Sequence, residues 1–289
     1  MRNNGLIFIN LANLPAQKTQ SLLRSGVDFA QFPFFPPEQF LSLGLNEDEA
    51  KALTDIRQSG EWEDELKSIE KNKVTIVTFF DEGYPQLLKE IACPPPVLYI
   101  NGNPAVLNGF SLAIVGSRTA TNYGVNMACE FARKLSALGV VIVSGLARGI
   151  DTAAHTGALA NKTVAVLGSG LLDIYPRENR RLSQMIAGNG AVISEFPLNT
   201  APLKDNFPRR NRIVSGLAKG ILVVEAAAKS GALITANCAL EQNREVFALP
   251  GKPDDFFSEG TNLLIQNGAK LVQNIDDILT EFNLCPQPN

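Results

Sequence analysis

The chain has 289 residues, of which 45% are hydrophobic and 19% charged, enough apolar material for one large α/β domain and a smaller companion. No apolar run reaches the roughly 18 residues that a membrane span needs, and we find no signal-peptide pattern at the N-terminus. The net charge of −3 and the pI of about 5.4 exclude a uniformly basic nucleic-acid binder, so such a role would require a local basic patch.

Residues 1–70 are predicted to form a small helical domain. Apolar side chains recur at helical spacing over residues 17–25, 37–43 and 47–59. Gly26 and Gly44 follow two of these segments, at positions where helices commonly end. Asn46 precedes three acidic residues, which is typical of a helix start. Nothing in this region indicates chemistry.

Residues 71–110 are predicted to connect this domain to the core. Residues 74–79 have the composition of a strand, residues 85–91 that of a short helix, and residues 97–100 that of another strand. Three consecutive prolines at residues 94–96 stiffen the entry to the second strand. We therefore expect a connector with short strands that join the core.

Residues 111–283 are predicted to form an extended Rossmann-like α/β core. Short apolar runs alternate with segments of helical spacing, and the runs lie at residues 112–115, 140–143, 164–167, 191–194, 221–224, 246–249 and 270–272. This alternation predicts a mostly parallel sheet with helices on both faces. The nearly continuous apolar character of the runs fits strands that are buried on both sides.

Glycines and arginines follow the predicted strands. In an open α/β sheet, ligands bind beyond the carboxyl ends of the strands, where glycine lets the backbone approach an anion. Residues 204–219 carry four net positive charges, five basic residues less Asp205, and residues 176–181 carry two, three arginines less Glu178. The arginines of this predicted rim are Arg118, Arg148, Arg177, Arg180, Arg209, Arg210 and Arg212. The alternative is a solvated face or structural ion pairs with Glu195, Glu225 and Glu241.

The first core loop, Gly116-Ser117-Arg118, lacks the G-x-G-x-x-G fingerprint of dinucleotide-binding proteins. We therefore expect no nucleotide cofactor. The four cysteines, at positions 93, 129, 238 and 285, form no C-x-x-C pair, which argues against zinc and against a disulfide framework. We expect free thiols in a reducing cytoplasm.

Asp151 and His155, the only histidine, stand four residues apart and would share one face of a helix. They could form an acid–base pair or part of a metal site, but one histidine and one aspartate are an incomplete metal site. A helix-start aspartate bonded to the histidine is the simpler interpretation. No motif compels a catalytic site, so we expect neither an enzyme nor a bound metal.

Together, the loops resemble the DNA-processing protein A family, DprA, also called Smf, over roughly residues 75–275. The motifs are GSR at 116–118, SGLARGID at 144–151, AHTGAL at 154–159, GSGLLDIYPREN at 168–179, ISEFP at 193–197, FPRRNRIVSGLA at 207–218, VVEAAAKSGALITA at 223–236 and REVFALPG at 244–251. The helical N-terminus resembles the sterile-alpha-motif-like domain that precedes the core in many members. Many members also end in a winged-helix domain, which we expect to be absent here.

The resemblance implies a bacterial cytoplasmic protein of natural transformation. Such proteins bind and protect incoming single-stranded DNA, displace single-strand-binding protein and load the RecA recombinase, commonly as homodimers. We expect the dimer interface at residues 217–249, whose predicted helices have apolar, small-residue faces. The resemblance marks Arg118 and Arg177 as principal DNA contacts. The full set of candidate DNA-binding residues is Gly116, Ser117, Arg118, Gly145, Arg148, Gly168, Gly170, Tyr175, Arg177, Asn179, Arg180, Phe207, Arg209, Arg210, Asn211, Arg212, Lys229 and Ser230.

Aromatic residues beside these loops could support bases, because single-stranded DNA is held by charged grooves with aromatic platforms. Tyr175, Phe196 and Phe207 are the candidates, and loop anchoring is the alternative role for each. A different class of function is a nucleotide-processing enzyme, such as a nucleoside-monophosphate phosphoribohydrolase of the lysine-decarboxylase-like type. Its P-G-G-x-G-T-x-x-E loop has no counterpart here, since residues 229–235 lack the paired glycines.

Overall fold

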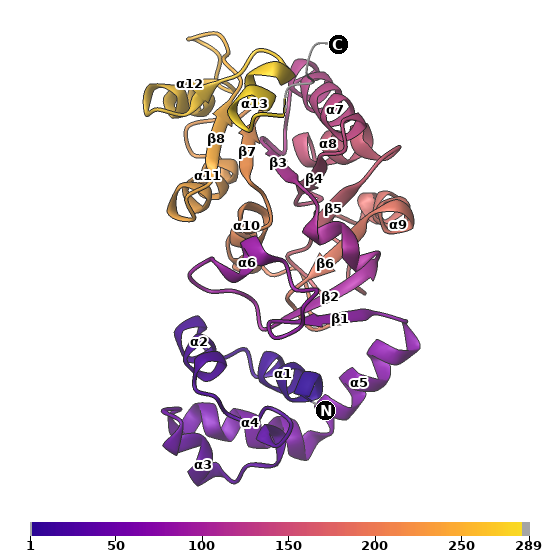
Figure 1. Ribbon diagram of the computed structural model, residues 1–289, viewed down its shortest axis with the longest axis vertical. Coiled ribbons are helices and arrows are strands. Elements are labelled where there is room, and N and C mark those ends of the chain that lie inside the picture. Colours follow the sequence, from indigo (N-terminus) through magenta and orange to yellow (C-terminus); the bar gives the residue numbers. More distant parts are fainter. Residues whose placement is uncertain (1, 285–289) are drawn as a thin grey trace.

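The computed structural model describes residues 2–284, and its first quarter is helical (Figure 1). This region contains α1 (Arg2–Leu11), α2 (Ala16–Arg24), η1 (Phe32–Phe34), α3 (Pro37–Ser42), α4 (Glu47–Ser59) and α5 (Glu61–Lys71). The predicted start of α4 is confirmed, because Asn46 and Glu49 form a reciprocal capping box. Helix α1 was not predicted, since its run of consecutive buried apolar residues has no helical period.

The rest of the chain forms a nine-stranded sheet with helices between its strands. The elements are β1 (Thr75–Thr78), α6 (Gln86–Lys89), β2 (Val97–Gly102), η2 (Pro104–Asn108), β3 (Ser111–Val115), α7 (Asn122–Ala137), β4 (Val141–Ser144), α8 (Ile150–Ala158), β5 (Thr163–Val166), η3 (Arg177–Asn179), α9 (Arg180–Asn189), β6 (Ala191–Ser194), α10 (Asn206–Gly216), β7 (Gly220–Val223), α11 (Gly231–Glu241), β8 (Glu245–Ala248), α12 (Glu259–Gln266), β9 (Lys270–Leu271) and α13 (Ile275–Glu281).

The strand order is β1-β2-β6-β5-β4-β3-β7-β8-β9. Strands β1 and β2 pair antiparallel with each other, and β2 pairs antiparallel with β6. All other neighbours are parallel, as the pairings of β3 with β4 and with β7 illustrate. The chain moves from β3 outward to β6 and then returns to place β7 on the other side of β3. The sheet therefore has a topological switch between β3 and β7, where ligand sites of open α/β sheets form.

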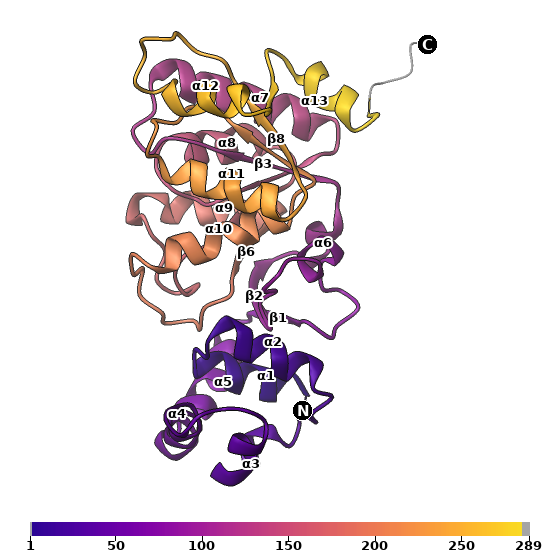
Figure 2. The same cartoon turned by 90° about the vertical axis from the view of Figure 1, so that its left-hand side faces the viewer.

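Helices cover both faces of this sheet (Figure 2). Side chains of α6, α10, α11 and α12 share one buried apolar cluster with the strands. Side chains of α7, α8 and α13 form another with β3, β4, β7 and β8. The predicted fold class, a mostly parallel sheet covered on both faces and preceded by a small helical region, is confirmed. Each predicted core strand occurs within one residue of its expected bounds.

A third apolar cluster joins the helical region to the antiparallel end of the sheet. It contains Phe8 of α1 and Trp62 of α5 together with Tyr99 of β2 and Val192 of β6. Within residues 2–284, no helix is long and apolar enough to cross a membrane. Cys93, Cys129 and Cys238 are free thiols, while Cys285 lies outside the described residues. The described residues contain no cluster of three or more groups suited to a metal ion.

Candidate nucleic-acid interface

The loops that follow β3, β4 and β5 meet the start of α10 at the carboxyl edge of the sheet. A cavity of about 340 Å³ lies at the switch between β3 and β7, and one of about 120 Å³ adjoins it. Arg118, Gly145, Ala147 and Arg210 line both. The larger cavity adds Gly116, Asp151, Asn211 and Ser230, and the smaller adds Arg148, Tyr175 and Phe207. The structure thus brings many of the predicted residues together.

Arg118 is the exposed basic side chain that both cavities share. Its guanidinium carbon lies 5.3 Å from the centre of the Phe207 ring, a cation–π distance. No hydrogen bond or ion pair links the guanidinium to another residue in the described part of the chain. The backbone behind it is fixed, since Ser117 N donates to Glu225 O at 2.8 Å and Ile150 N donates to Ser117 O at 3.2 Å. Arg118 therefore presents free donors from a rigid loop.

Phe207 and Tyr175 form an aromatic pair beside Arg118. Their ring centres are 5.7 Å apart with the planes tilted by 54°, and Tyr175 is 41% exposed. Gly168 makes room for this pair, because a Cβ there would lie 2.8 Å from the Phe207 ring. An exposed guanidinium next to aromatic faces is the chemistry that holds single-stranded nucleic acid.

Arg210 lies beneath this surface rather than on it. It is 4% exposed, and its guanidinium donates to the carbonyl oxygens of Gly145 and Val166. Gly145 must be glycine for this packing, since a Cβ there would lie 2.6 Å from the guanidinium. Burial lowers the pKa of Arg210 to about 10, and Asp151 opposes that shift, so the group stays charged at neutral pH. Its charge acts on both cavities from below.

Asp151 holds the loop between β4 and α8. Its carboxylate accepts hydrogen bonds from Gly145 N at 3.1 Å and Ala147 N at 3.2 Å. Burial raises the pKa of Asp151, which the Arg210 charge partly offsets. The predicted bond to His155 is wrong, because His155 Nδ1 instead contacts Thr163 Oγ1 at 2.8 Å. Among the described residues, the two side chains therefore have different hydrogen-bond partners and share no hydrogen bond.

Three other candidates are engaged within the protein. Arg212 pairs with Glu195 and donates to Cys93 O at 2.6 Å, so the alternative of a structural ion pair holds for this residue. Asn179 is buried and donates to Leu146 O at 2.8 Å. Arg148 pairs with Glu178 at the surface, where such pairs exchange readily with solvent.

The remaining candidates surround the cavities without all entering them. Arg177 and Arg180 are exposed on η3 and at the start of α9, and Lys229 is exposed on the loop after β7. Ser230 caps α11 and accepts from Ala232 N at 3.3 Å. Gly170 serves the fold, because a Cβ there would lie 2.2 Å from Leu198 O.

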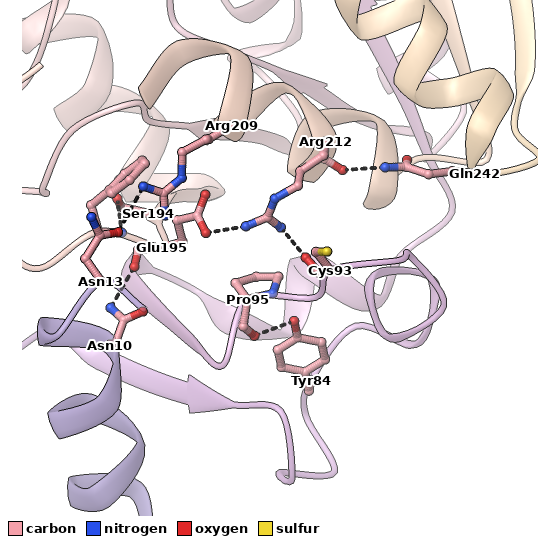
Figure 3. A network of polar contacts seen from close by, with 11 residues as sticks. Asn10, Asn13, Tyr84, Cys93, Pro95, Ser194, Glu195, Arg209, Arg212 and Gln242 are labelled. Carbon is pink, nitrogen blue, oxygen red and sulfur yellow. Dashed lines mark hydrogen bonds and ion pairs between the residues drawn. The ribbon is translucent and has the colours of Figure 1, made fainter. Parts of the chain in front are cut away.

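Arg209 connects the core to the helical region, a contact that the sequence did not predict. Its guanidinium lies 5.2 Å from the centre of the Phe196 ring and donates to Asn13 Oδ1 at 2.9 Å. Asn13 follows α1, so Arg209 connects the basic edge of the sheet to the helical region (Figure 3). No local pattern marks Asn13, which is 196 residues from Arg209.

The sequence and the fold are similar to those of known proteins. A family model described as DNA recombination-mediator protein A matches residues 75–283. Protein Smf of Escherichia coli is 51% identical over 68% of this chain and 54% of its own length, so the chain spans about half of that relative. DNA processing protein DprA of Streptococcus pneumoniae is 45% identical over 74% of this chain and 77% of its own length.

Two solved structures are also similar. The X-ray structure of DprA from Streptococcus pneumoniae covers 96% of this chain and 97% of its own, with a TM-score of 0.86 and 35% identity. A structure of DprA from Helicobacter pylori, described for its single-stranded DNA binding mode, covers 72% of this chain and 96% of its own. Its TM-score is 0.67 at 32% identity.

Proposed function

The chain belongs to the DNA recombination-mediator protein A family, and from that premise we propose that it binds single-stranded DNA at the carboxyl edge of its sheet. The observation that carries the proposal is Arg118, whose unpaired donors lie over the Phe207 ring beside two cavities. A guanidinium offers a bidentate fork to phosphate oxygens. The Helicobacter pylori relative's described binding of single-stranded DNA supports the same ligand.

The proposed contacts fall into two groups. Arg118, Tyr175 and Phe207 touch the strand directly, and the exposed Arg177, Arg180 and Lys229 attract its phosphates from around the cavities. Arg210 and Asp151 position the loops from below. Phosphate contacts of this kind fix a strand without reading its sequence.

The biological role that we propose is a cytoplasmic recombination mediator of natural transformation. In this role the protein protects incoming single-stranded DNA, displaces single-strand-binding protein and loads the RecA recombinase, and it acts as a homodimer. Family membership supports these steps. Co-sedimentation of the protein with RecA, with and without a DNA strand, tests the recombinase contact separately from DNA binding.

Fluorescence anisotropy of a labelled oligo-dT strand at two salt concentrations tests the DNA proposal. If about four to six phosphates are neutralised, the logarithm of the affinity should fall with the logarithm of salt at a slope of roughly −3 to −4. Unlabelled duplex should compete poorly, because a platform for unstacked bases needs a single strand. A flat salt response, or no binding at low salt, would reject the proposal.

A further inference from the structure

A second recess lies between the helical region and the core, beyond Arg209. Two adjoining cavities of about 660 and 470 Å³ open on either side of the contact between Arg209 and Asn13. Both are lined by Asn10, Asn13, Glu195 and Arg209. We call these two cavities the interdomain cleft. A volume of this size exceeds that of a single nucleobase.

Glu195 gives the cleft an unsatisfied acceptor (Figure 3). The residue is 5% exposed, and one carboxylate oxygen, Oε2, pairs with Arg212. The other, Oε1, is buried and has no hydrogen-bond partner among the described residues. Buried carboxylate oxygens normally accept a hydrogen bond, since leaving one unpaired is costly. A ligand in the cleft that donates a hydrogen bond would satisfy it once the carboxylate turns toward the opening.

The charged residues that line the larger cavity determine which part of a nucleotide it can bind. Glu61, Asp64 and Glu65 line it in addition to Glu195, whereas Arg209 is the one basic residue in its described lining. Two of these four carboxylates are paired, Glu195 with Arg212 and Asp64 with Lys67, and the lining still offers a phosphate no excess of positive charge. Leu11, Phe196 and Leu203 supply apolar walls. Apolar walls with acceptors at the edge fit a nucleobase, whose faces are apolar and whose edge carries donors.

The first turn of α10 links this cleft to the proposed DNA site. Phe207 stacks with Arg118 at the rim, and two residues later Arg209 stacks on Phe196 at the cleft. The first turn of α10 thus contributes one residue to each of two cation–π pairs between an arginine and a phenylalanine. Residues two apart in an α-helix lie about 200° apart around its axis, so a strand would reach the second pair by passing around the N-terminal end of α10.

We propose that the interdomain cleft is a base subsite for the same strand and that it prefers bases with an exocyclic amino group, which donates to Glu195 Oε1. This inference rests on the proposed function. The backbone stays on the basic rim while a base turns into the acidic cleft. The helical region then contributes to DNA binding through Asn13, which holds Arg209.

Cytosine and thymine provide a matched test, because at ring position 4 cytosine carries an amino donor and thymine a carbonyl acceptor. We expect oligo-dC to bind more tightly than oligo-dT of equal length by roughly three- to tenfold, the effect of one charged hydrogen bond in a partly open site. Equal, salt-dependent affinities would overturn the base subsite and leave the proposed function standing. Absence of binding to either strand would overturn both.

The variant Glu195→Gln should invert the preference. Arg212 needs an acceptor, so the amide oxygen of the glutamine faces Arg212 and its NH₂ group faces the cleft, where it donates to thymine. Glu90→Gln is the matched control, because Glu90 also pairs with an arginine, Arg244, but does not line the cleft. An unchanged dC preference in a folded Glu195→Gln variant would reject the assignment of Oε1. If that variant does not fold, the wild-type comparison of the two strands still decides.

Free nucleotides distinguish a base of the bound strand from an independent ligand. Deoxycytidine monophosphate at millimolar concentration should displace oligo-dC only weakly, because it lacks the backbone contacts on the rim. Tight, cytosine-selective binding of this nucleotide, measured by calorimetry, that displaces no oligo-dC would identify the cleft as a separate nucleotide site and overturn its link to the strand.

Discussion

At the residue scale, the proposed function depends most on Arg118, whose donors are unpaired in the described structure. We expect Arg118→Ala to weaken binding to all single strands alike by roughly tenfold or more, and to reduce the salt slope by about 0.7 for each phosphate that the protein no longer neutralises. Arg118→Lys should recover only part of the affinity, because lysine keeps the charge without the planar fork. Anisotropy titrations with oligo-dT and oligo-dC measure both effects.

Arg133→Ala serves as the control for that substitution, since Arg133 is exposed on α7 and lines neither cavity at the rim. It should change affinity little. Equal reductions in affinity for the two variants would mean that general charge, rather than the position of Arg118, determines binding.

His155 makes the stability of the fold depend on pH. Burial, aided by the Arg210 charge, lowers the pKa of His155 from 6.5 to about 3. Below pH 6.5 the histidine is therefore protonated in the unfolded chain but stays neutral in the folded chain. The free energy of unfolding then decreases by about 1.4 kcal/mol per pH unit down to pH 3. Between pH 7.5 and pH 5 the wild type should lose about 2 kcal/mol more than His155→Gln.

Urea denaturation at the two pH values measures that difference. Because other groups titrate equally in both proteins, the comparison isolates His155. Parallel decreases in stability of the wild type and the variant would show that His155 is protonated in the folded state, against its complete burial and its contact with Thr163.

At the scale of elements, the loop between β4 and α8 and the helix α10 are built around each other. Gly145→Ala would place a Cβ 2.6 Å from the buried Arg210 guanidinium, which would have to shift and weaken its hydrogen bonds to two carbonyl groups. We expect a decrease of about 1–3 kcal/mol in the free energy of unfolding, typical of overpacking. Gly188→Ala in α9 is the control: nothing lies within 4 Å of its Cβ, so helix propensity should make it neutral or stabilising.

Denaturant unfolding of the two variants measures these changes, and DNA binding by Gly145→Ala reports whether the loop has moved. Equal stability of both variants would contradict the close packing of Gly145 on Arg210.

The strands of the core could be predicted from sequence because each is a short apolar run between turn residues, as β4 and β6 illustrate. The position of the candidate site could also be predicted, because the loops that follow parallel strands all lie at the carboxyl edge of the sheet. The direction in which individual side chains point could not be predicted in this way. Arg209 and Arg210 are adjacent in sequence, yet about 100° of helical rotation separates them, so one is exposed and the other buried. That difference depends on where α10 meets the sheet, which local pattern does not specify.

At the scale of the whole molecule, the helical region and the core share one apolar cluster and are joined by specific hydrogen bonds. Asn10 Nδ2 donates to Glu195 O at 2.8 Å, and Leu198 N donates to the buried Glu65 carboxylate at 2.9 Å. Burial raises the pKa of Glu65. These hydrogen bonds pair residues more than 100 positions apart, which is why the sequence predicted both parts but not the cleft between them. The division at residues 70 and 110 stays a prediction.

The proposed homodimer is the prediction that concerns the whole assembly. Exposed apolar side chains occur on α11 and α12, where Ile234 is 44%, Leu240 59% and Leu263 45% exposed. Both helices also contribute to one apolar cluster with the strands and contact β8, next to the β9 end of the sheet. Exposed apolar side chains that lie together are typical of protein–protein interfaces, and the predicted interface region, residues 217–249, includes two of these residues, Ile234 and Leu240.

We expect sedimentation equilibrium of the wild type at micromolar concentration to give twice the chain mass of 31.2 kDa. Leu240→Asp should shift the protein to the monomer, raising the dissociation constant by at least about tenfold, because it places an unpaired charge in a desolvated interface. Leu138→Asp is the matched control, since Leu138 is 51% exposed at the end of α7, outside the predicted region. If Leu138→Asp dissociates the dimer and Leu240→Asp does not, the interface lies on the opposite face of the sheet, over α7. A wild type that sediments as a monomer would reject the dimer itself, while leaving each chain with its complete set of rim contacts.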